Sequence, residues 1–537
     1  MKNPAKKRSG HLVIMIGAGP AALYATAKLA EEGHTVLILN RDVKTGGLAE
    51  YGIYPTKHKM KEGLRKQFRR ILAKPSVHYF GNAPVGEKTP LRLADLQSLE
   101  VSAIVVAAGA QGTKWLGLPG EEGPGVYHAK DLVYHYNDLP PFSGQDFPIG
   151  DRVAVVGIGN VMVDIAHYLV NMRQVKEVIA VARRGPKERA YDDREMRSVA
   201  WNIDRDALKQ ELERIRTRLE DVGQNIEEIY RDLTKDCSAP PEDGETPTQI
   251  TFRFLSAPKR IVRDEQGHVA ALEVEETKLV ARDGGGLAAK GLGELTQIPV
   301  DTVVFAVGDR VDAELGLPSA NGGYATNPHP DQADPDAAKY QVYDPERGHP
   351  VDGWYVIGWS RSASEGVVGK ARLDGEKGAA VVNRYLARRP PLSLKEIYNR
   401  IGAIYHRLRQ GHVPVIHKGL WRILEEAEAE GARRTGDPEF KFAFNPEMFQ
   451  SIEARLAQYT AARGRQPSVS EENHLLRCLP LYTACFPSGA GLTAEELAER
   501  TGLPGERLLP LLDSLNTQGI VEQVTGGAPR WRLKKLS

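Results

Sequence analysis

The sequence is poor in cysteine, with only Cys237, Cys478 and Cys485 among its 537 residues. These three form no CxxC pair and no four-ligand set, which argues against a redox disulfide, an iron–sulfur cluster and a cysteine-based zinc site. No apolar run approaches the roughly twenty residues that a membrane helix needs. The basic amino terminus, MKNPAKKRSGHL, has no apolar core segment and is not typical of a secretory signal. We therefore expect a cytoplasmic protein without a membrane segment.

An excess of charge of either sign is also absent. The chain has 71 Lys and Arg against 70 Asp and Glu, which gives a formal net charge of +1. This balance gives no support to wholesale binding of nucleic acid or membrane, although local patches could still matter. The hydrophobic share of 41% and the charged share of 26% are ordinary for a globular protein. The length is too great for one compact domain, and we expect two to four.

The chain does contain two glycine-rich turns, each between an expected strand and an expected helix. The apolar run 12–16 enters Gly17-Ala18-Gly19-Pro20-Ala21-Ala22, after which apolar residues recur at helical spacing. The pattern returns in RVAVVGIGNVMVDIAHYL, where Gly157 and Gly159 open the helix. Glycine in such turns lets the backbone approach a pyrophosphate, and the helix amino end offers N–H groups to it. The repetition favours two dinucleotide sites over two α/β layers without a ligand.

The residues at the tips of the next strands differ between the two sites. In VLILNRD (36–42), Asn40 stands where such sites usually carry a ribose-binding acid, and its amide can still hydrogen-bond a hydroxyl. At the second site, Arg183 and Arg184 match the 2′-phosphate of NADP, the alternative being two solvent-exposed arginines on a loop. Two dinucleotide sites without a reactive cysteine pair or a metal set suggest a flavin in one and a nicotinamide in the other.

The chain beyond residue 390 has a different character. The proline-rich RRPPL at 388–392 marks a seam, and 464–537 has the order helix, short helix, turn, third helix and two short strands, IVEQV and RWRLKK. This order is typical of a winged helix-turn-helix. The third helix offers only Arg507 as a base against Glu506 and Asp513, which is too few for a helix that reads a DNA groove. DNA binding is therefore not favoured, and contact with a protein partner is the expected use of this module.

Several segments together resemble one known family. These are GAGPAALYATAKL, GGLAEYGIYPTKHKMK, YFGNAPVG, VVAAGAQGTKWLGLPGEEGPGVYHA, VVGIGNVMVDIA, RRGPKERAYDDREMR and YVIGWSRSASEGVVG. Their order is similar to that of the adrenodoxin-reductase type of ferredoxin–NADP reductase, which is related to the small subunit of glutamate synthase. The resemblance covers about the first 390 residues. It implies an α/β fold with two Rossmann-like dinucleotide-binding domains, followed here by a C-terminal helical and winged-helix-like extension.

The resemblance also implies how the chain is divided. We expect an FAD-binding domain made of 1–112 and 310–390, with an NADP-binding domain at 113–309 inserted between its two parts. A helical tail at 391–463 and the winged-helix-like domain at 464–537 complete the chain.

The resemblance implies which residues bind the cofactors, FAD and NADP(H). The FAD set is Gly17, Gly19, Ala21, Asn40, Leu48, Val85, Trp359, Gly366, Val367 and Val368. The NADP(H) set is Gly157, Gly159, Asn160, Val161, Arg183, Arg184 and Glu195. The catalytic positions fall on Lys57, Trp359 and Glu365. The chain departs from the family where its Asp-His pair falls on Thr56 and Lys57, and where a second glutamate falls on Ser198, so we expect NADPH binding to be kept and turnover to be affected.

Two charged helical segments are also expected, at 57–74 and at 201 to about 235. In KHKMKEGLRKQFRRILAK (57–74) the helical spacing places Met60, Leu64, Phe68 and Ile71 inward and Lys61, Arg65, Lys66, Arg69 and Arg70 outward. A solvated face is one interpretation of this basic strip. The other is a docking surface for an acidic electron carrier, ferredoxin or flavodoxin, because charge complementarity raises association rates.

The leading hypothesis is an FAD-dependent oxidoreductase that passes electrons from NADPH to a small electron carrier such as ferredoxin. Two alternatives stay open. One is an electron-input subunit of a larger redox complex, although the absence of amino-terminal cysteine clusters counts against the glutamate synthase role. The other is a redox-sensing regulator that uses the winged helix.

Overall fold

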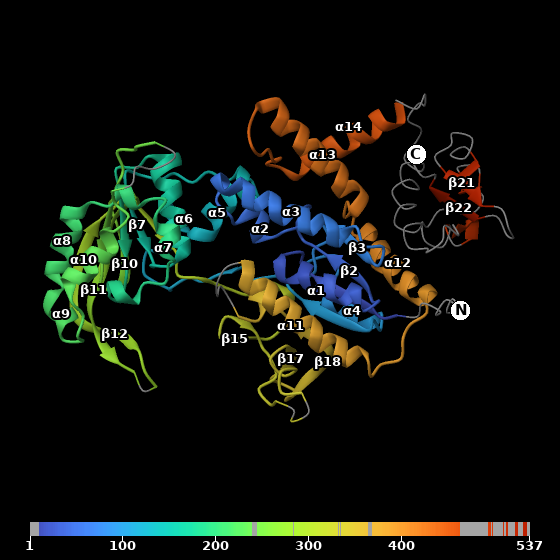
Figure 1. Cartoon of the computed structure of the whole chain (residues 1–537), viewed down its shortest axis with the longest axis horizontal. Coiled ribbons are helices and arrows are strands. Elements are labelled where there is room, and N and C mark those ends of the chain that lie inside the picture. Colours follow the sequence, from blue (N-terminus) through green and yellow to red (C-terminus); the bar gives the residue numbers. More distant parts are fainter. Residues whose placement is uncertain are drawn as a thin grey trace. The chain divides into compact units, whose positions relative to one another are not determined.

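The computed structural model describes residues 10–238, 244–282, 284–330, 332, 334–362 and 368–461, with short segments between 492 and 533 (Figure 1). The chain divides into two compact units, of which the first combines Met1–Gly112 with Arg310–Ser537 and the second is Thr113–Asp309. Each unit contains a parallel sheet of its own. Within the described part of the chain, no helix is both long and apolar enough to cross a membrane.

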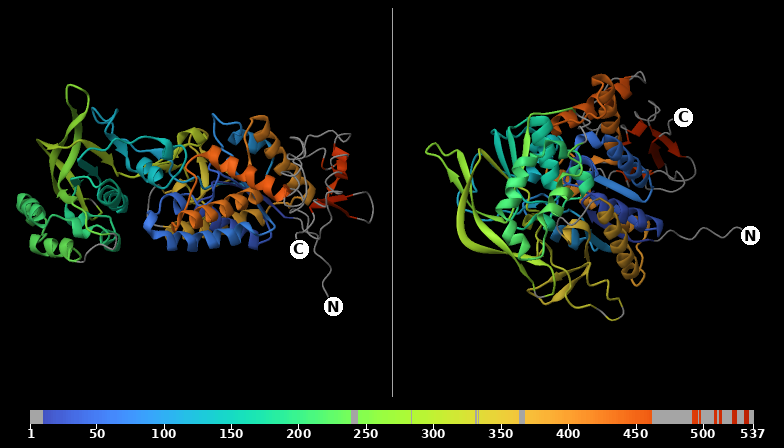
Figure 2. Two further views of the ribbon diagram at one scale, coloured as in Figure 1. Left: turned by 90° about the horizontal axis from the view of Figure 1, so that it is seen from above. Right: turned by 60° about the vertical axis from the view of Figure 1, so that its left-hand side comes forward.

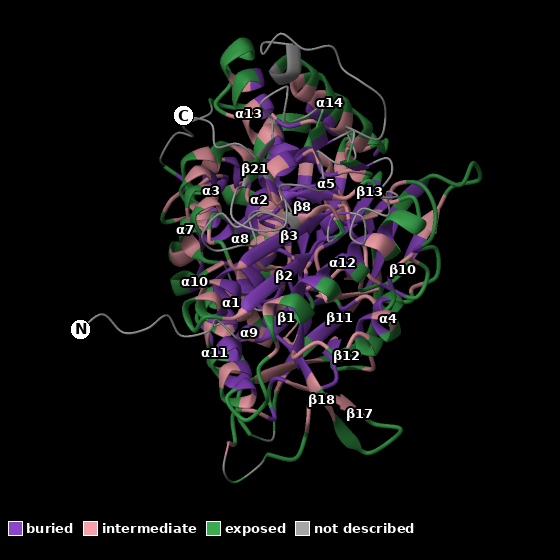
Figure 3. Ribbon diagram, turned by 90° about the vertical axis from the view of Figure 1, so that its right-hand side faces the viewer, coloured by how far each residue is buried: buried purple, intermediate pink, exposed green. Residues whose placement is uncertain are grey.

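The first unit is built on a seven-stranded sheet in the order β17-β18-β4-β1-β2-β3-β19. The five central strands run parallel, and the two edge strands are antiparallel to their neighbours. The strands are β1 (Leu12–Ile16), β2 (Thr35–Leu39), β3 (Val77–Gly81), β4 (Ala103–Val106), β17 (Gln341–Asp344), β18 (His349–Val356) and β19 (Ile416–His417). The central strands β1, β2 and β3 are buried along their whole length (Figure 3), as expected for apolar runs covered on both faces.

Alternate residues of β1 belong to two separate cores, one on each face of this sheet. Leu12, Ile14 and Ile16 share a core with α4 (Leu93–Ser98) and α12 (Leu394–Gln410). Val13 and Met15 share the other core with five helices. These are α1 (Pro20–Glu31), α3 (His58–Leu72), α11 (Val368–Leu386), α13 (Lys418–Thr435) and α14 (Asn445–Ala461). Within this second layer α11 packs along α1 (Figure 1 and Figure 2).

The second unit has a five-stranded parallel sheet in the order β6-β13-β7-β8-β9. Its strands are β6 (Val126–His128), β7 (Arg152–Val156), β8 (Glu177–Val181), β9 (Gln249–Arg253) and β13 (Thr302–Phe305). Its helices are α5 (Ala129–Tyr136), α6 (Asn160–Tyr168), α7 (Asp193–Met196), α8 (Arg205–Arg214), α9 (Arg216–Glu220) and α10 (Ile226–Thr234). The last three confirm the helical segment that was predicted from 201 to about 235. The predicted α/β fold with two dinucleotide-binding-type sheets is thereby confirmed.

Smaller sheets are also present among the described residues. In the second unit, β10 (Ser256–Arg263), β11 (Val269–Ala281) and β12 (Leu287–Pro299) form an antiparallel sheet. Near the carboxyl end, β21 (Val521–Val524) and β22 (Arg530–Leu533) form an antiparallel pair, where two short strands were expected. Most of the three helices expected within 464–537 lies outside the described residues, so the winged-helix assignment stays a prediction.

Candidate functional site

The first glycine-rich turn joins β1 to α1. Gly17 has a φ of +105°, and a Cβ at this position would lie 2.4 Å from the carbonyl oxygen of Ala107, so only glycine is tolerated. Gly19 is the N-cap of α1, receives no side-chain cap, and a Cβ on it would meet open space. The N–H groups in the first turn of this twelve-residue helix are therefore accessible to an anion.

The second glycine-rich turn repeats this geometry between β7 and α6. Gly157 has a φ of +123°, and a Cβ there would lie 2.3 Å from the carbonyl oxygen of Ala306. Gly159 is the N-cap of α6, again without a side-chain cap and with open space beyond it. Asn160 holds the next segment in place, since its Oδ1 accepts a hydrogen bond of 2.7 Å from the N–H of Asp192, and Val161 is 39% exposed. Both turns thus fit a pyrophosphate, one in each unit.

Asn40 has a structural role that the sequence did not predict. The side chain is buried, and its Nδ2 donates to the carbonyl oxygens of Asp42 at 2.9 Å and Lys44 at 2.8 Å. The same nitrogen lies 3.2 Å from the hydroxyl of Tyr79. Both amide hydrogens therefore shape the loop that leads from β2 to Gly46, so the expected bond to a ribose hydroxyl would use the side-chain oxygen of Asn40.

We expect Asn40→Asp to destabilise this loop, although the substitution restores an acid at the usual ribose-binding position. It replaces a donor by a carboxylate that faces two carbonyl oxygens in a buried site, which costs about 2–4 kcal/mol. The measurement is the melting temperature of the purified protein together with its flavin content. Asn82→Asp is the matched control, because the Asn82 amide donates to the Pro414 carbonyl at an exposed position. A more stable Asn40→Asp variant with tighter flavin binding would contradict this interpretation.

Arg183 and Arg184 follow β8, where the sequence predicted a phosphate-binding pair. Arg183 is exposed and Arg184 is half-buried, and neither makes an ion pair with the residues that the structure describes. By contrast, Arg189 on the same loop is paired with Asp193 and Asp232. Glu195 lies half-buried in α7. The two guanidinium groups at the strand tip are thus available to an anionic ligand.

Trp359 lies in a short turn, Gly358–Ser360, that is held at both ends. Gly358 has a φ of +64°, its N–H donates to Oδ2 of Asp374 at 2.5 Å, and a Cβ on it would lie 2.7 Å from Cβ of Ala21. Ser360 is fully buried, and its Oγ accepts from the N–H of Gly109 at 2.9 Å. Trp359 is therefore fixed close to the amino end of α1.

Asp374 was missed by the sequence analysis, although it holds this turn. Besides Gly358 it accepts from Nη2 of Arg361 at 2.5 Å and from the hydroxyl of Tyr340 at 3.3 Å. The next residue, Gly375, allows the close approach of α11 to α1, because a Cβ there would lie 2.2 Å from the carbonyl oxygen of Ala21. Asp374 could have been identified from the sequence, because it is an acid directly before a glycine on the buried side of an expected helix.

The remaining predicted site residues are only partly described. Lys57 ends a short 3-10 turn before α3, Leu48 begins the short helix α2 (Leu48–Tyr51), and Val85 forms an isolated bridge with Leu91. Val368 is the first residue of α11. Glu365, Gly366 and Val367 lie outside the described residues.

The predicted orientation of the basic helix α3 is wrong in two places. Lys61 was expected outward but is 1% exposed, and Met60 was expected inward but is 56% exposed. Arg65 and Arg69 are not free surface charges either, because both are engaged in ion pairs. Phe68 and Ile71 are buried, as expected. The docking surface predicted from these residues is therefore not present in the form expected.

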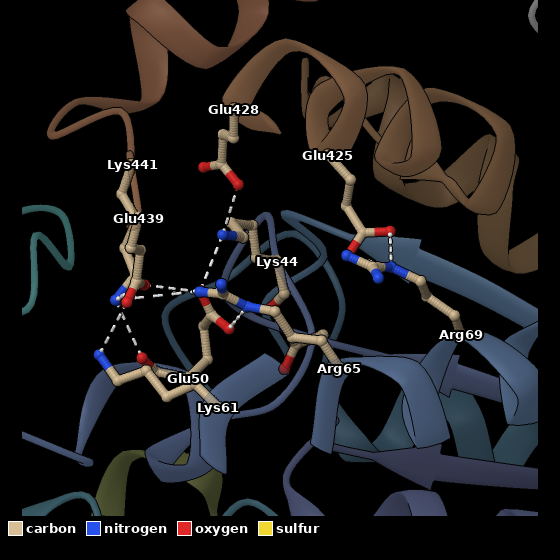
Figure 4. Close-up of polar contacts among 10 residues, drawn as sticks. Lys44, Glu50, Lys61, Arg65, Arg69, Glu425, Glu428, Glu439 and Lys441 are labelled. Carbon is tan, nitrogen blue, oxygen red and sulfur yellow. Dashed lines mark hydrogen bonds and ion pairs between the residues drawn. The ribbon is translucent and has the colours of Figure 1, made fainter. Parts of the chain in front are cut away.

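The cause is a buried ion-pair network between α3, the segment before it and the tail (Figure 4). Glu50 lies at its centre, with Lys44 Nζ at 2.8 Å and Arg65 Nη2 at 2.5 Å. Tail carboxylates complete the network: Lys44–Glu428 at 2.6 Å, Arg65–Glu439 at 2.6 Å, Lys441–Glu439 at 3.1 Å, Lys61–Glu439 at 3.4 Å and Arg69–Glu425 at 3.1 Å. Acids more than 350 positions away thus cover the cations of α3.

Comparison with known proteins identifies the family. The family model described as pyridine nucleotide-disulphide oxidoreductase matches residues 11–336, which is more than half of the chain. The chain belongs to this family. The predicted resemblance and the predicted oxidoreductase class are thereby confirmed.

Several proteins to which this chain is similar are named as NADPH-dependent reductases of small electron carriers. The NADPH-ferredoxin reductase FprA of Mycobacterium tuberculosis is 27% identical over 475 residues, which cover 82% of this chain and 98% of that protein. The mitochondrial NADPH:adrenodoxin oxidoreductase of Homo sapiens is 24% identical, with coverage of 82% and 91%. The structure of Mycobacterium tuberculosis FprA in complex with NADPH matches this fold with a TM-score of 0.68 at 24% identity, over 82% of this chain and 99% of that one.

The family is named for disulphide chemistry, to which Cys237, the cysteine within the described residues, is poorly suited. Cys237 is buried among the described residues, and burial raises the pKa of its thiol. A raised pKa lowers the thiolate fraction and therefore the reactivity of the sulfur. The environment of Cys237 therefore does not favour a redox-active thiol at this position.

Proposed function

We propose that this protein is an NADPH-dependent FAD enzyme that passes electrons to a small protein carrier. The observation that carries the proposal is the pair of glycine turns with accessible helix amino ends. The second turn is followed by Arg183 and Arg184, which have no ion-pair partner in the part of the chain that the structure describes. One turn lies in each unit, as two different dinucleotides require. The names of similar proteins, NADPH-ferredoxin reductase and NADPH:adrenodoxin oxidoreductase, support the choice of donor and acceptor class.

We assign FAD to the first unit and NADP(H) to the second. The FAD domain would comprise 1–112 and 310–390, and the NADP domain 113–309. FAD would be held by Gly17, Gly19, Ala21, Asn40, Leu48, Val85, Trp359, Gly366, Val367 and Val368, and NADP(H) by Gly157, Gly159, Asn160, Val161, Arg183, Arg184 and Glu195. The chemistry supplied by the bound groups is acceptance of a hydride from NADPH by FAD, followed by release of single electrons. The chain binds and orients them, and the turn that Asp374 and Ser360 hold keeps Trp359 in place.

The test of this proposal is an absorbance spectrum of the purified protein, followed by anaerobic titration with NADPH. A flavin spectrum that bleaches on addition of NADPH, and far less on addition of NADH, is the expected result. A protein without flavin, or a flavin that NADPH does not reduce, would refute the proposed function.

The carrier is proposed to dock on the exposed face of α3. This face carries fewer available cations than the sequence predicted, because Lys61, Arg65 and Arg69 are engaged in ion pairs. Lys59, Lys66 and Arg70 are exposed on one face of this helix and make no ion pair within the described residues. A groove of about 500 Å³ is lined by Lys59 and Lys66 together with His58, Glu62, Gly63, Arg65 and Pro438. Exposed cations on one helix face suit an acidic protein partner, because complementary charge speeds the encounter.

Reversing the charge of Lys59, Lys66 and Arg70 to glutamate is expected to slow reduction of an acidic ferredoxin. Surface pairs contribute at most about 1 kcal/mol each and are screened by salt, so the rate should fall on the order of tenfold at low ionic strength and converge with wild type at high salt. Reduction of ferricyanide should not change. The control reverses Lys278, Arg282 and Lys290, three exposed cations of the β11–β12 hairpin, which alters the net charge equally. Equal slowing by both variants would show that net charge, not this face, sets the rate.

A further inference from the structure

The loop that carries Arg183 and Arg184 is attached to the rest of the second unit through three consecutive carbonyl groups. The carbonyl of Ala182 accepts from the N–H of Ser256 at 2.9 Å, and that of Arg184 accepts from the N–H of Leu255 at 3.2 Å. The middle carbonyl, that of Arg183, accepts from the hydroxyl of Thr277 at 2.8 Å. Thr277 therefore supplies the one bond in this series that depends on a side chain.

Thr277 is held rigidly where it makes this bond. It is 2% exposed, and its own N–H donates to the carbonyl of Leu255 at 2.8 Å. It lies at an irregularity of β11, where the pairing with β12 shifts register between Glu275 and Thr277. A register shift re-aims the side chains beside it, and here it places the hydroxyl against the loop after β8.

The neighbouring residue, Glu276, ties this irregularity to the helical segment α8–α9. Its buried carboxylate accepts from Arg214 at 2.7 Å, Arg218 at 2.8 Å and Arg253 at 2.5 Å. Arg218 also donates to the carbonyl oxygen of Thr277 at 3.0 Å. These arginines have partners within the protein and therefore serve the structure, whereas Arg183 and Arg184 have no ion-pair partner among the described residues.

We propose that Thr277 is a positioning residue for NADPH specificity, which rests on the proposed function. Its hydroxyl fixes the backbone of Arg183. The loop therefore already has the conformation in which the guanidinium group can contact the 2′-phosphate when the nucleotide binds. A guanidinium group that is fixed in advance loses less conformational freedom when the phosphate binds. The effect is confined to nucleotides that carry this phosphate, since Thr277 itself reaches only the protein backbone.

The experiment compares Thr277→Val, which removes the hydroxyl and nearly keeps the shape, with Thr277→Ser, which keeps the hydroxyl. In Thr277→Val we expect the KM for NADPH and the dissociation constant of 2′,5′-ADP to rise about fivefold, the loss typical of one neutral hydrogen bond. The KM for NADH and the kcat with NADPH should stay within about twofold of wild type. Thr277→Ser should restore the NADPH values.

Thr251→Val is the matched control, because Thr251 lies on β9 in the same unit and its hydroxyl donates to Glu177 at 2.9 Å, at the start of β8 and away from the arginine loop. It should leave the ratio of the two KM values unchanged. A Thr277→Val variant with an unchanged ratio, or one that weakens NADPH and NADH equally, would overturn the inference. If wild type itself did not distinguish NADPH from NADH, the proposed function would fail instead. Melting temperatures separate loss of specificity from loss of folding, and Thr277→Ser provides the test if the valine variant does not fold.

Discussion

Replacing Glu50 by alanine is expected to destabilise the first unit by about 3–5 kcal/mol, because it leaves buried cations without their shared partner. Glu50 is 3% exposed. Burial alone would raise the pKa of its carboxyl, but Lys44, Lys441 and Arg65 outweigh burial and hold this pKa well below its usual range. Without Glu50, four buried or half-buried cations of the network would lose a shared carboxylate and keep Glu428 and Glu439 among their partners.

The measurement is urea unfolding of the full chain, followed by circular dichroism. Glu62→Ala provides the control, since Glu62 is 42% exposed and its partner within the described residues is the half-exposed Arg69, a kind of pair that contributes at most about 1 kcal/mol. Equal unfolding midpoints for the two variants would mean that the network adds no stability. Since Glu428 and Glu439 belong to the tail, we also expect Glu50→Ala to make the tail susceptible to proteolysis.

The double substitution Arg183→Ala and Arg184→Ala is expected to abolish the preference for NADPH over NADH. Each guanidinium group can form charge-assisted hydrogen bonds with a phosphate dianion, and together they contribute about 3 kcal/mol. The KM for NADPH should therefore rise on the order of 100-fold, while that for NADH changes little. Stopped-flow reduction of the bound flavin by each nucleotide gives the comparison directly.

Lys187 provides the control for this double substitution, because it is an exposed cation on the same loop, 3.8 Å from Glu228. Lys187→Ala should retain the preference for NADPH. If it lost the preference as fully as the double variant, the general positive charge of the loop would be responsible. If the double variant kept the preference, the arginines would be an ordinary exposed pair, the alternative that the sequence left open.

The Glu50 variant and the arginine variants are expected to affect two different properties, the stability of the protein and its choice of nucleotide. The ion-pair network around Glu50 holds the tail to the rest of the first unit, and the arginine pair is proposed to select the nucleotide in the second unit. A variant of Glu50 should thus lower stability without changing the ratio of KM values for the two nucleotides. A variant of the arginines should change that ratio without lowering the melting temperature.

Residues whose role depends on the local backbone were predictable from the sequence. Gly17 and Gly157 each follow an apolar strand and precede a helix, and both adopt a positive φ that other residues rarely tolerate. Arg183 and Arg184 lie at the end of a strand, a position that the sequence predicts because the order of glycine turn, helix and strand is regular in such sites. Periodicity likewise predicted the buried Phe68 and Ile71 of α3.

Only the tertiary structure decided what the polar residues beside these motifs do. Lys61 is buried because Glu439 of the tail reaches it, and the amide nitrogen of Asn40 donates to two carbonyl groups because the loop after it folds back. Thr277 and Asp374 act on turns far away in the sequence. The physical reason is that a backbone preference depends on a few adjacent residues, whereas the environment of a charge or hydrogen-bonding group depends on whatever distant segment packs against it.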